Sequence, residues 1–199
     1  MARIEDILQY WLGDLDQDGL AAPERQKMWF QKSEATDRDI RTRFEPDYEA
    51  IVGGEREDWL ETPRGTLAYV IVLDQLARNM FRETAKMYAA DDLALSAVGR
   101  ALERGWDEEL LAQERTFLYM PLMHSESLPD QERCCTCFGR LAEEGSENAR
   151  RRARGNLDYA RRHRDIVAQF GRFPHRNEIL GRETTAEEAQ FLTQPGSSF

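Results

Sequence analysis

The residues of this chain most able to do chemistry near neutral pH are its three histidines. They stand in the strings His124-Ser-Glu, His163-Arg-Asp and His175-Arg-Asn, within segments whose other residues have the spacing of a protein core. Burying one unpaired polar group costs about 2 to 7 kcal/mol, so buried imidazoles need a partner or a ligand. The sequence therefore predicts a polar centre to which the histidines contribute.

A fourth polar group, Asp74 to Asn79, follows the most apolar run of the chain, residues 67–73. On a helix Asp74 lies one turn from Arg78, and Gln75 lies one turn from Asn79, so two polar pairs project from adjacent faces. A buried ion pair of this kind can simply specify packing. An arginine fork also suits carboxylate or phosphate, which leaves a role in a ligand pocket equally open.

The elements that must position these groups are predicted to be helices. His124 shares a stripe with Phe117 and Met120, and His163 shares one with Tyr159, at the three- and four-residue spacing of an amphipathic helix. Residues 67–73 could form a buried strand, but no partner strand is visible and the run continues without a break into polar residues. We expect a buried central helix there. Gly171 should end the helix that carries His163.

Nine to eleven such helices, and no convincing strand, predict an all-α fold, an antiparallel helix-turn-helix array. At 199 residues and 41% hydrophobic content, with no Pro-, Gly- or Ser-rich linker, residues 1–199 are expected to form a single compact domain.

The charge balance argues against a nucleic-acid partner, because the net charge is −10 and the isoelectric point is about 4.9. Residues 150–182 differ, with ten arginines against three acidic residues, a local +7 that leaves −17 elsewhere. This segment is either a solvated helix face or the wall of a site for an anion. No apolar run approaches the ~20 residues that cross a bilayer, and residues 4–12 do not resemble a targeting signal, so we expect a cytoplasmic protein.

The candidate site is assembled from these groups. A histidine could act as general base, oriented by a carboxylate from elsewhere in the chain, and arginines and amides could hold an anion. The candidate catalytic residues are His124, His163, His175, Asp74 and Glu126. The candidate ligand-binding residues are Arg78, Asn79, Arg164, Arg172, Arg176 and Asn177.

No metal or cofactor is predicted, because the chain lacks the tight ligand pairs, such as His-Glu-x-x-His, that mark such sites. The loop Asp14 to Asp18 copies the first half of a calcium-binding loop, but its ninth and twelfth positions are Ala22 and Arg25. A solvated acidic loop is favoured, and weak calcium binding stays open. Cys134 and Cys137 are expected to remain reduced, and the stripe that Cys134 forms with Phe138 points to core packing.

Several motifs together resemble a known family: Trp29-Phe30, Ile40-Arg41-Thr42-Arg43-Phe44, Leu73-Asp74-Gln75-x-x-Arg78-Asn79, Phe117-Leu118-Tyr119-x-Pro121-x-x-His124-Ser125-Glu126, and the block from His163 to Arg182. They are similar to the bacterial domain-of-unknown-function 924 family over about Ile4 to Phe191. The resemblance implies an all-helical, tetratricopeptide-repeat-like fold and no agreed activity. One departure is Leu76-Ala77, where the family usually has Phe-Pro.

Three functional hypotheses follow. The first is a binding protein whose polar centre holds a small anion or an acidic peptide terminus. The second is an enzyme, such as a hydrolase, with a histidine general base and arginines that support an oxyanion. The third is a structural scaffold that binds another protein through an outer face, which an apolar patch above ~600 Å² would favour.

Overall fold

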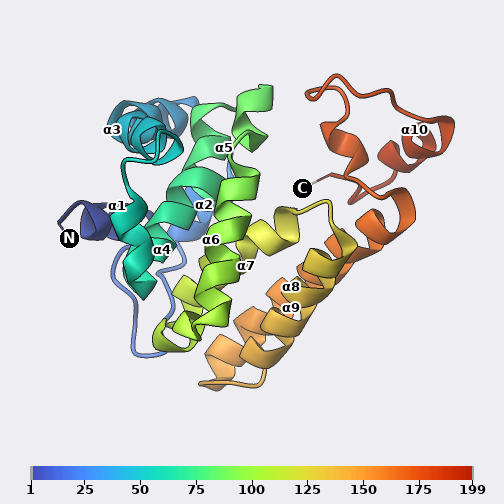
Figure 1. Ribbon diagram of the computed structural model, residues 1–199. Helices are drawn as coiled ribbons and strands as arrows, with labels where there is room; N and C mark the ends of the chain where they lie inside the picture. Colours follow the sequence, from blue (N-terminus) through green and yellow to red (C-terminus); the bar gives the residue numbers. More distant parts are fainter. Residues whose placement is uncertain (1, 199) are drawn as a thin grey trace.

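The computed structural model describes residues 2–198, and Figure 1 shows them as an assembly of helices. Within this range the structure contains no strand beyond one isolated bridge between Leu15 and Ala21. The predicted all-α class is therefore confirmed. The elements, where η denotes a short 3-10 or π-helical segment, are α1 (Ala2–Leu12), α2 (Arg25–Phe30), α3 (Glu34–Val52), η1 (Glu57–Glu61), α4 (Pro63–Val70), η2 (Ile71–Leu76), α5 (Ala77–Met80), η3 (Ala85–Tyr88), α6 (Asp91–Glu103), η4 (Trp106–Glu109), α7 (Ala112–His124), α8 (Leu128–Leu141), α9 (Glu147–Phe170), η5 (Pro174–Arg176) and α10 (Ala186–Leu192).

The helix ends follow local sequence signals. Thr62 caps α4 by accepting a hydrogen bond from the Gly65 amide, with Pro63 in the first turn, where its missing N–H costs nothing. Gly171 ends α9 in the left-handed conformation at φ 67°, which glycine adopts without steric cost. Thr185 and Glu188 form the reciprocal capping box that begins α10.

The apolar run 67–73 lies in a continuous helical rod, α4–η2–α5, at the centre of the core, and each of its residues is at most 3% exposed. The predicted central helix is thus confirmed, with one difference. Residues Ile71–Leu76 form a π-helical segment, in which the Ala77 amide donates to the Val72 carbonyl five residues earlier. Such segments often occur at functional sites. Here the π-helical turn carries Asp74 and Gln75.

The core is built around this rod by α1, α3, α6 and α7, and its aromatic centre joins Trp11, Trp29 and Phe117, whose rings meet at 4.8 to 6.2 Å. Helices α8 and α9 pack against each other along their length, as Figure 1 shows, and α7 contacts both. A smaller apolar cluster, of Ile166, Val167 and Phe173, joins the end of α9 to the segment that follows it.

The cysteines of α8 belong to this packing. Cys134 and Cys137 are buried and free, and burial raises the pKa of both thiols. A raised pKa makes a thiol a poor nucleophile, so core packing explains them better than chemistry does. No helix in residues 2–198 is both long and apolar enough to span a membrane.

Candidate functional site

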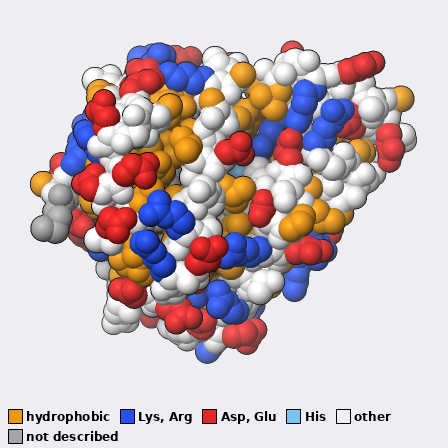
Figure 2. All heavy atoms as spheres, in the orientation of Figure 1, with side chains coloured by type: hydrophobic (Ala, Val, Ile, Leu, Met, Phe, Trp, Pro, Cys, Tyr) orange, Lys and Arg blue, Asp and Glu red, His pale blue; other side chains and the backbone are white. Residues whose placement is uncertain are grey.

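A cavity of about 1130 Å³ lies between α7 and α9, which form two of its walls. Residues of α2, the α4–η2–α5 rod, η3 and η5 complete the lining. In Figure 2 acidic and basic side chains are interspersed over the face shown, and the pale blue of histidine is almost hidden. All three histidines instead line the cavity, together with Gln75, Arg78, Asn79 and Arg176. The structure thus brings distant segments of the chain to one place.

His124, in the cavity wall, contacts the buried Asp74 behind it. The His124 Nδ1 lies 2.7 Å from the Asp74 Oδ1, and the Asp74 side chain is 0% exposed. Because an ionised carboxylate only accepts hydrogen bonds, Nδ1 carries the proton, and in the neutral ring Nε2 keeps its lone pair. Burial lowers the pKa of His124, and this outweighs the opposing effect of Asp74. At neutral pH His124 is therefore a neutral imidazole whose Nε2 can accept a proton.

The Asp74 carboxylate is held by two further partners from its own helix. The Gln75 Nε2 donates to Oδ2 at 2.5 Å, and the Arg78 Nη1 lies 3.2 Å from Oδ1. Burial alone would raise the pKa of Asp74, but Arg78 and His124 together hold it well below its usual range. Asp74 is consequently an anion that fixes the ring of His124.

Arg78 continues the network to the first residue of α6. Its two terminal nitrogens each lie 3.1 Å from an oxygen of Asp91, a bidentate pair, and its Nη1 also donates to the Asp74 carbonyl at 2.6 Å. Burial, together with the nearby Asp74, raises the pKa of Asp91, although Arg78 opposes the rise. Two carboxylates thus fix the orientation of the Arg78 guanidinium.

Arg176 is held differently, by stacking rather than by a close ion pair. Its guanidinium carbon lies 4.7 Å from the centre of the Tyr88 ring and 4.5 Å from that of the Phe173 ring. Its nearest carboxylate oxygen, on Asp91, is 3.8 Å away. The side chain is only 7% exposed, and its buried Nε makes no hydrogen bond within residues 2–198. Burial, reinforced by the Arg78 charge, lowers the pKa of Arg176.

The other two histidines lie close to this pair of networks. The ring centres of His124 and His163 are 6.5 Å apart, and the Phe173 ring lies 5.6 Å from both His163 and His175. The His163 Nδ1 donates to the Tyr159 carbonyl at 2.8 Å, which leaves the lone pair on Nε2. Burial lowers the pKa of His163 to about 3 and that of His175 to about 4. Both rings are thus neutral at neutral pH.

Glu126 and Asn79 stand at the edge of the site with structural partners. Glu126 accepts from the Phe173 amide at 2.8 Å and from both terminal nitrogens of Arg182, so it fastens η5 to the end of α7. The Asn79 Nδ2 donates to Asp37 at 2.8 Å, while Asn79 also lines the cavity. Of the two carboxylates considered for orienting a histidine, Asp74 is the one that contacts His124.

Three predicted ligand-binding residues lie outside the cavity lining. Arg164 is a partly exposed residue of α9 near α8, and it pairs with Asp165. Arg172 pairs with Glu188 at 2.6 Å, and Asn177 is buried against the same carboxylate. The contacts of Arg172 and Asn177 with Glu188 secure the C-terminal segment, and none of the three predicted residues belongs to the candidate site.

Sequence reasoning missed several residues of the cavity. Tyr88 lines the cavity and packs against Arg176, and Asp91, which lies outside the lining, holds Arg78; neither was among the predicted site residues. Arg151 and Arg152 were visible only as part of the basic segment 150–182, and both line the cavity. Helical spacing could have found Arg152, because it lies eleven residues before His163, about three turns along the same face of α9.

In the acidic loop Asp14 to Asp18, an aspartate side chain accepts hydrogen bonds from backbone amides of the loop itself and of Leu20. The Asp16 carboxylate accepts from the amides of Asp18 and Leu20, each at 2.9 Å, and the Asp18 carboxylate accepts from Asn148. Among the described residues no group of three or more potential ligands is arranged to hold a metal ion.

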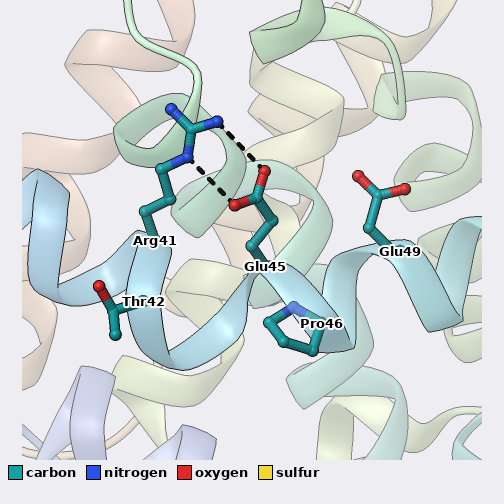
Figure 3. Close-up of a pocket in the computed structure, with 5 residues that line it drawn as sticks. All are labelled: Arg41, Thr42, Glu45, Pro46 and Glu49. Atoms are coloured by element: carbon teal, nitrogen blue, oxygen red, sulfur yellow. Dashed lines mark hydrogen bonds and ion pairs between the residues drawn. The ribbon is translucent and has the colours of Figure 1, made fainter.

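A second hollow lies on the surface of α3 (Figure 3), lined by Arg41, Thr42, Glu45, Pro46 and Glu49. Arg41 pairs there with Glu45 one turn later, at 3.1 and 3.3 Å. Exposed pairs of this kind contribute little and present no unsatisfied buried group. We therefore place the candidate site in the histidine-lined cavity.

Comparison with known proteins agrees with the resemblance seen in the motifs. The model of a family described as bacterial protein of unknown function (DUF924) matches residues 7–196. The chain belongs to this DUF924 family. A solved structure titled as a protein of unknown function, ATU0120 from Agrobacterium tumefaciens, is 39% identical, with a TM-score of 0.81 over 96% of this chain and 97% of the other. No curated protein matches the chain.

Most of the blocks by which the chain resembles DUF924 contribute to the cavity, whereas the block Ile40 to Phe44 lies outside its lining. Asp74 to Asn79 supplies the carboxylate and one arginine, the end of α7 supplies His124, and the block from His163 to Arg182 supplies the remaining imidazoles and Arg176. At the departure from the DUF924 pattern, the Ala77 amide makes the π-helical hydrogen bond to Val72. A proline at that position could not donate this bond.

Proposed function

We propose that this DUF924 protein binds a small organic anion in the histidine-lined cavity, with Arg176 as the principal cationic contact. The observation that supports the proposal best is the state of Arg176. Its charge is buried and stacked between two rings, and its Nε has no acceptor within the described chain. An unsatisfied buried donor costs about 1 to 3 kcal/mol, which a bound anion would offset.

The composition of the cavity wall supports the same ligand class. Five arginines are part of the described lining, and Asp16 is its single acidic residue. The carboxylates of Asp74 and Asp91 are absent from the lining and instead hold Arg78 in place. Two preorganised guanidiniums at one end of a cavity give strong, directional hydrogen bonds to a carboxylate or phosphate.

The cavity also has room and an apolar surface for the body of such a ligand. Its volume is at or above the range typical of small-molecule sites, about 300 to 1,000 Å³. Trp29, Phe117 and Met120 are among the apolar lining residues. Two of the large exposed hydrophobic side chains, Phe30 and Tyr159, also lie in this lining. This placement favours a ligand in the cavity over a protein docked on an outer face.

A thermal-shift screen of small carboxylates and phosphates tests the proposal. A ligand present at 100 times its dissociation constant adds about 2.7 kcal/mol, which for a chain of this size corresponds to roughly 5 to 10 °C in Tm. The response should disappear in Arg176→Met, which keeps the stacking but removes the charge. It should persist in the matched control Arg164→Met, because Arg164 lies outside the cavity. An unchanged response in Arg176→Met would contradict the proposal.

A second candidate function is hydrolysis with His124 as general base. The specific observation in its favour is the 2.7 Å contact to Asp74, which orients the ring as the acid does in a catalytic triad. A panel of p-nitrophenyl esters and phosphates tests it. Turnover that falls about 10²-fold or more in both His124→Gln and Asp74→Asn supports catalysis. If no substrate is turned over above background, or if His124→Gln keeps full activity, only the binding function remains.

A further inference from the structure

Helices α7 and α9 run parallel to each other along the cavity and give it two distinct ends. At the start of the pair, the Arg152 Nη2 lies 3.5 Å from the Gln113 Oε1. At the far end, the rings of His124 and His163 are 6.5 Å apart. On each helix these two positions are eleven residues apart, which at about 1.5 Å per residue is roughly 16 Å. The cavity is therefore elongated along the two helices.

The end that lies opposite Arg176 is also cationic. Arg151 and Arg152 both line it. Arg151 donates to the Asn148 side-chain oxygen at 3.1 Å. Arg152 contacts Gln113 and, with the Gln26 amide turned so that its oxygen faces the guanidinium, donates to Gln26 at 2.9 Å. These hydrogen-bond partners are neutral amides. Asp16, the acidic residue of the lining, acts on Arg152 through its charge, so the two guanidiniums outnumber the one carboxylate at this end.

Between the two cationic ends the lining becomes largely apolar. Phe117 and Met120 of α7 lie about one to two turns from either end, and Trp29 packs on Phe117 with ring centres 4.8 Å apart. On this stretch Asn156 and Thr116 satisfy each other across the helices at 3.4 Å. The cavity lining is therefore cationic at both ends and largely apolar between them.

We propose that the ligand is an elongated dianion with an apolar body, of the class of α,ω-dicarboxylates; this inference rests on the anion-binding function proposed above. One anionic group binds at Arg176, the apolar body lies along Phe117 and Met120, and the second anionic group binds at Arg151 and Arg152. Because the guanidiniums reach inward from both ends, the two anionic groups are separated by less than the roughly 16 Å of helix.

Calorimetric titration of the full chain with straight-chain α,ω-dicarboxylates of four to twelve carbons tests this. With C–C bonds of about 1.5 Å, an extended chain of roughly eight to twelve carbons spans the distance between the two ends. Affinity should rise with length and be highest in that range. The monomethyl ester of the same diacid should bind about tenfold or more weakly, because one charge-assisted contact is lost.

The variants separate the two ends of the cavity. Arg152→Met should lower the affinity of the diacid to about that of its monoester. Arg176→Met should weaken both ligands, and Arg164→Met should weaken neither. If diacid and monoester bind equally, or if Arg152→Met has no effect, the two-ended site is wrong although the anion site stands. If neither ligand binds at millimolar concentration, both proposals fail.

Discussion

Lowering the pH from 7.5 to 5 should destabilise this protein strongly, because its histidines are buried as neutral rings. His163 illustrates the reasoning. Its pKa is about 3 in the folded chain, and an exposed histidine has a pKa near 6.5. Between these values the unfolded chain binds a proton that the folded chain does not. Stability is therefore complete above pH 6.5 and falls as the pH decreases toward 3.

The size of the effect follows from the same two values. One pKa unit corresponds to about 1.36 kcal/mol, so at pH 5 His163 lowers the free energy of unfolding by about 2 kcal/mol. His175, with a pKa of about 4, adds a similar amount, and the pKa of His124 is shifted in the same direction. Exposed carboxylates titrate mainly below this window, so the histidines dominate it.

Urea denaturation at several pH values between 5 and 8 measures this dependence, with the m-value checked for constancy. The variant His163→Gln should lose about 2 kcal/mol of the pH 7.5 to pH 5 difference, because its side chain does not titrate. The reasoning is refuted if the profile of the native chain is flat across this window. It is equally refuted if His163→Gln keeps the full slope.

Three further changes probe the network and its support. Asp74→Asn should cost about 3 to 5 kcal/mol in urea denaturation, because the buried Arg78 keeps only one of its two carboxylates and the His124 Nδ1–H loses its charged acceptor; a loss below about 1 kcal/mol would argue against this role. Glu126→Gln should speed hydrogen exchange of the Phe173 amide, with unchanged exchange as the contrary result. Gly171→Ala should lower stability by about 1 to 2 kcal/mol because of the residue's φ of 67°, and an unaltered Tm would contradict this.

The fold was largely predictable because the helix signals are local. Thr62 with Pro63, and Thr185 with Glu188, mark helix starts in the sequence and in the structure alike. The π-helical turn at Ile71–Leu76 was not predictable, because every residue before Asp74 in that run is apolar. A helix that is apolar on all faces has no alternation of polar and apolar residues. The sequence therefore cannot show that one turn contains an extra residue.

The candidate site was predictable in its residue types and less so in its pairings. The helical spacing of His124 and His163 predicted that both side chains face the interior, and both line the cavity. Arg164 was grouped with His163 as a neighbour in sequence, but adjacent residues on a helix differ by about 100° and point to different sides. The contact between Arg172 and Glu188 joins segments sixteen residues apart across a loop, and no local rule predicts such a contact.

The three imidazoles line one cavity together with Arg176, where we propose that an anion binds. The chain contains only these three histidines, so an NMR spectrum of its ring signals assigns one resonance set to each. When a carboxylate that binds in the thermal-shift screen is added stepwise at pH 7.5, the ring signals of all three histidines should shift together, with a common dissociation constant. In Arg176→Met none of these signals should shift. Shifts confined to one histidine, or shifts that persist in Arg176→Met, would contradict the claim.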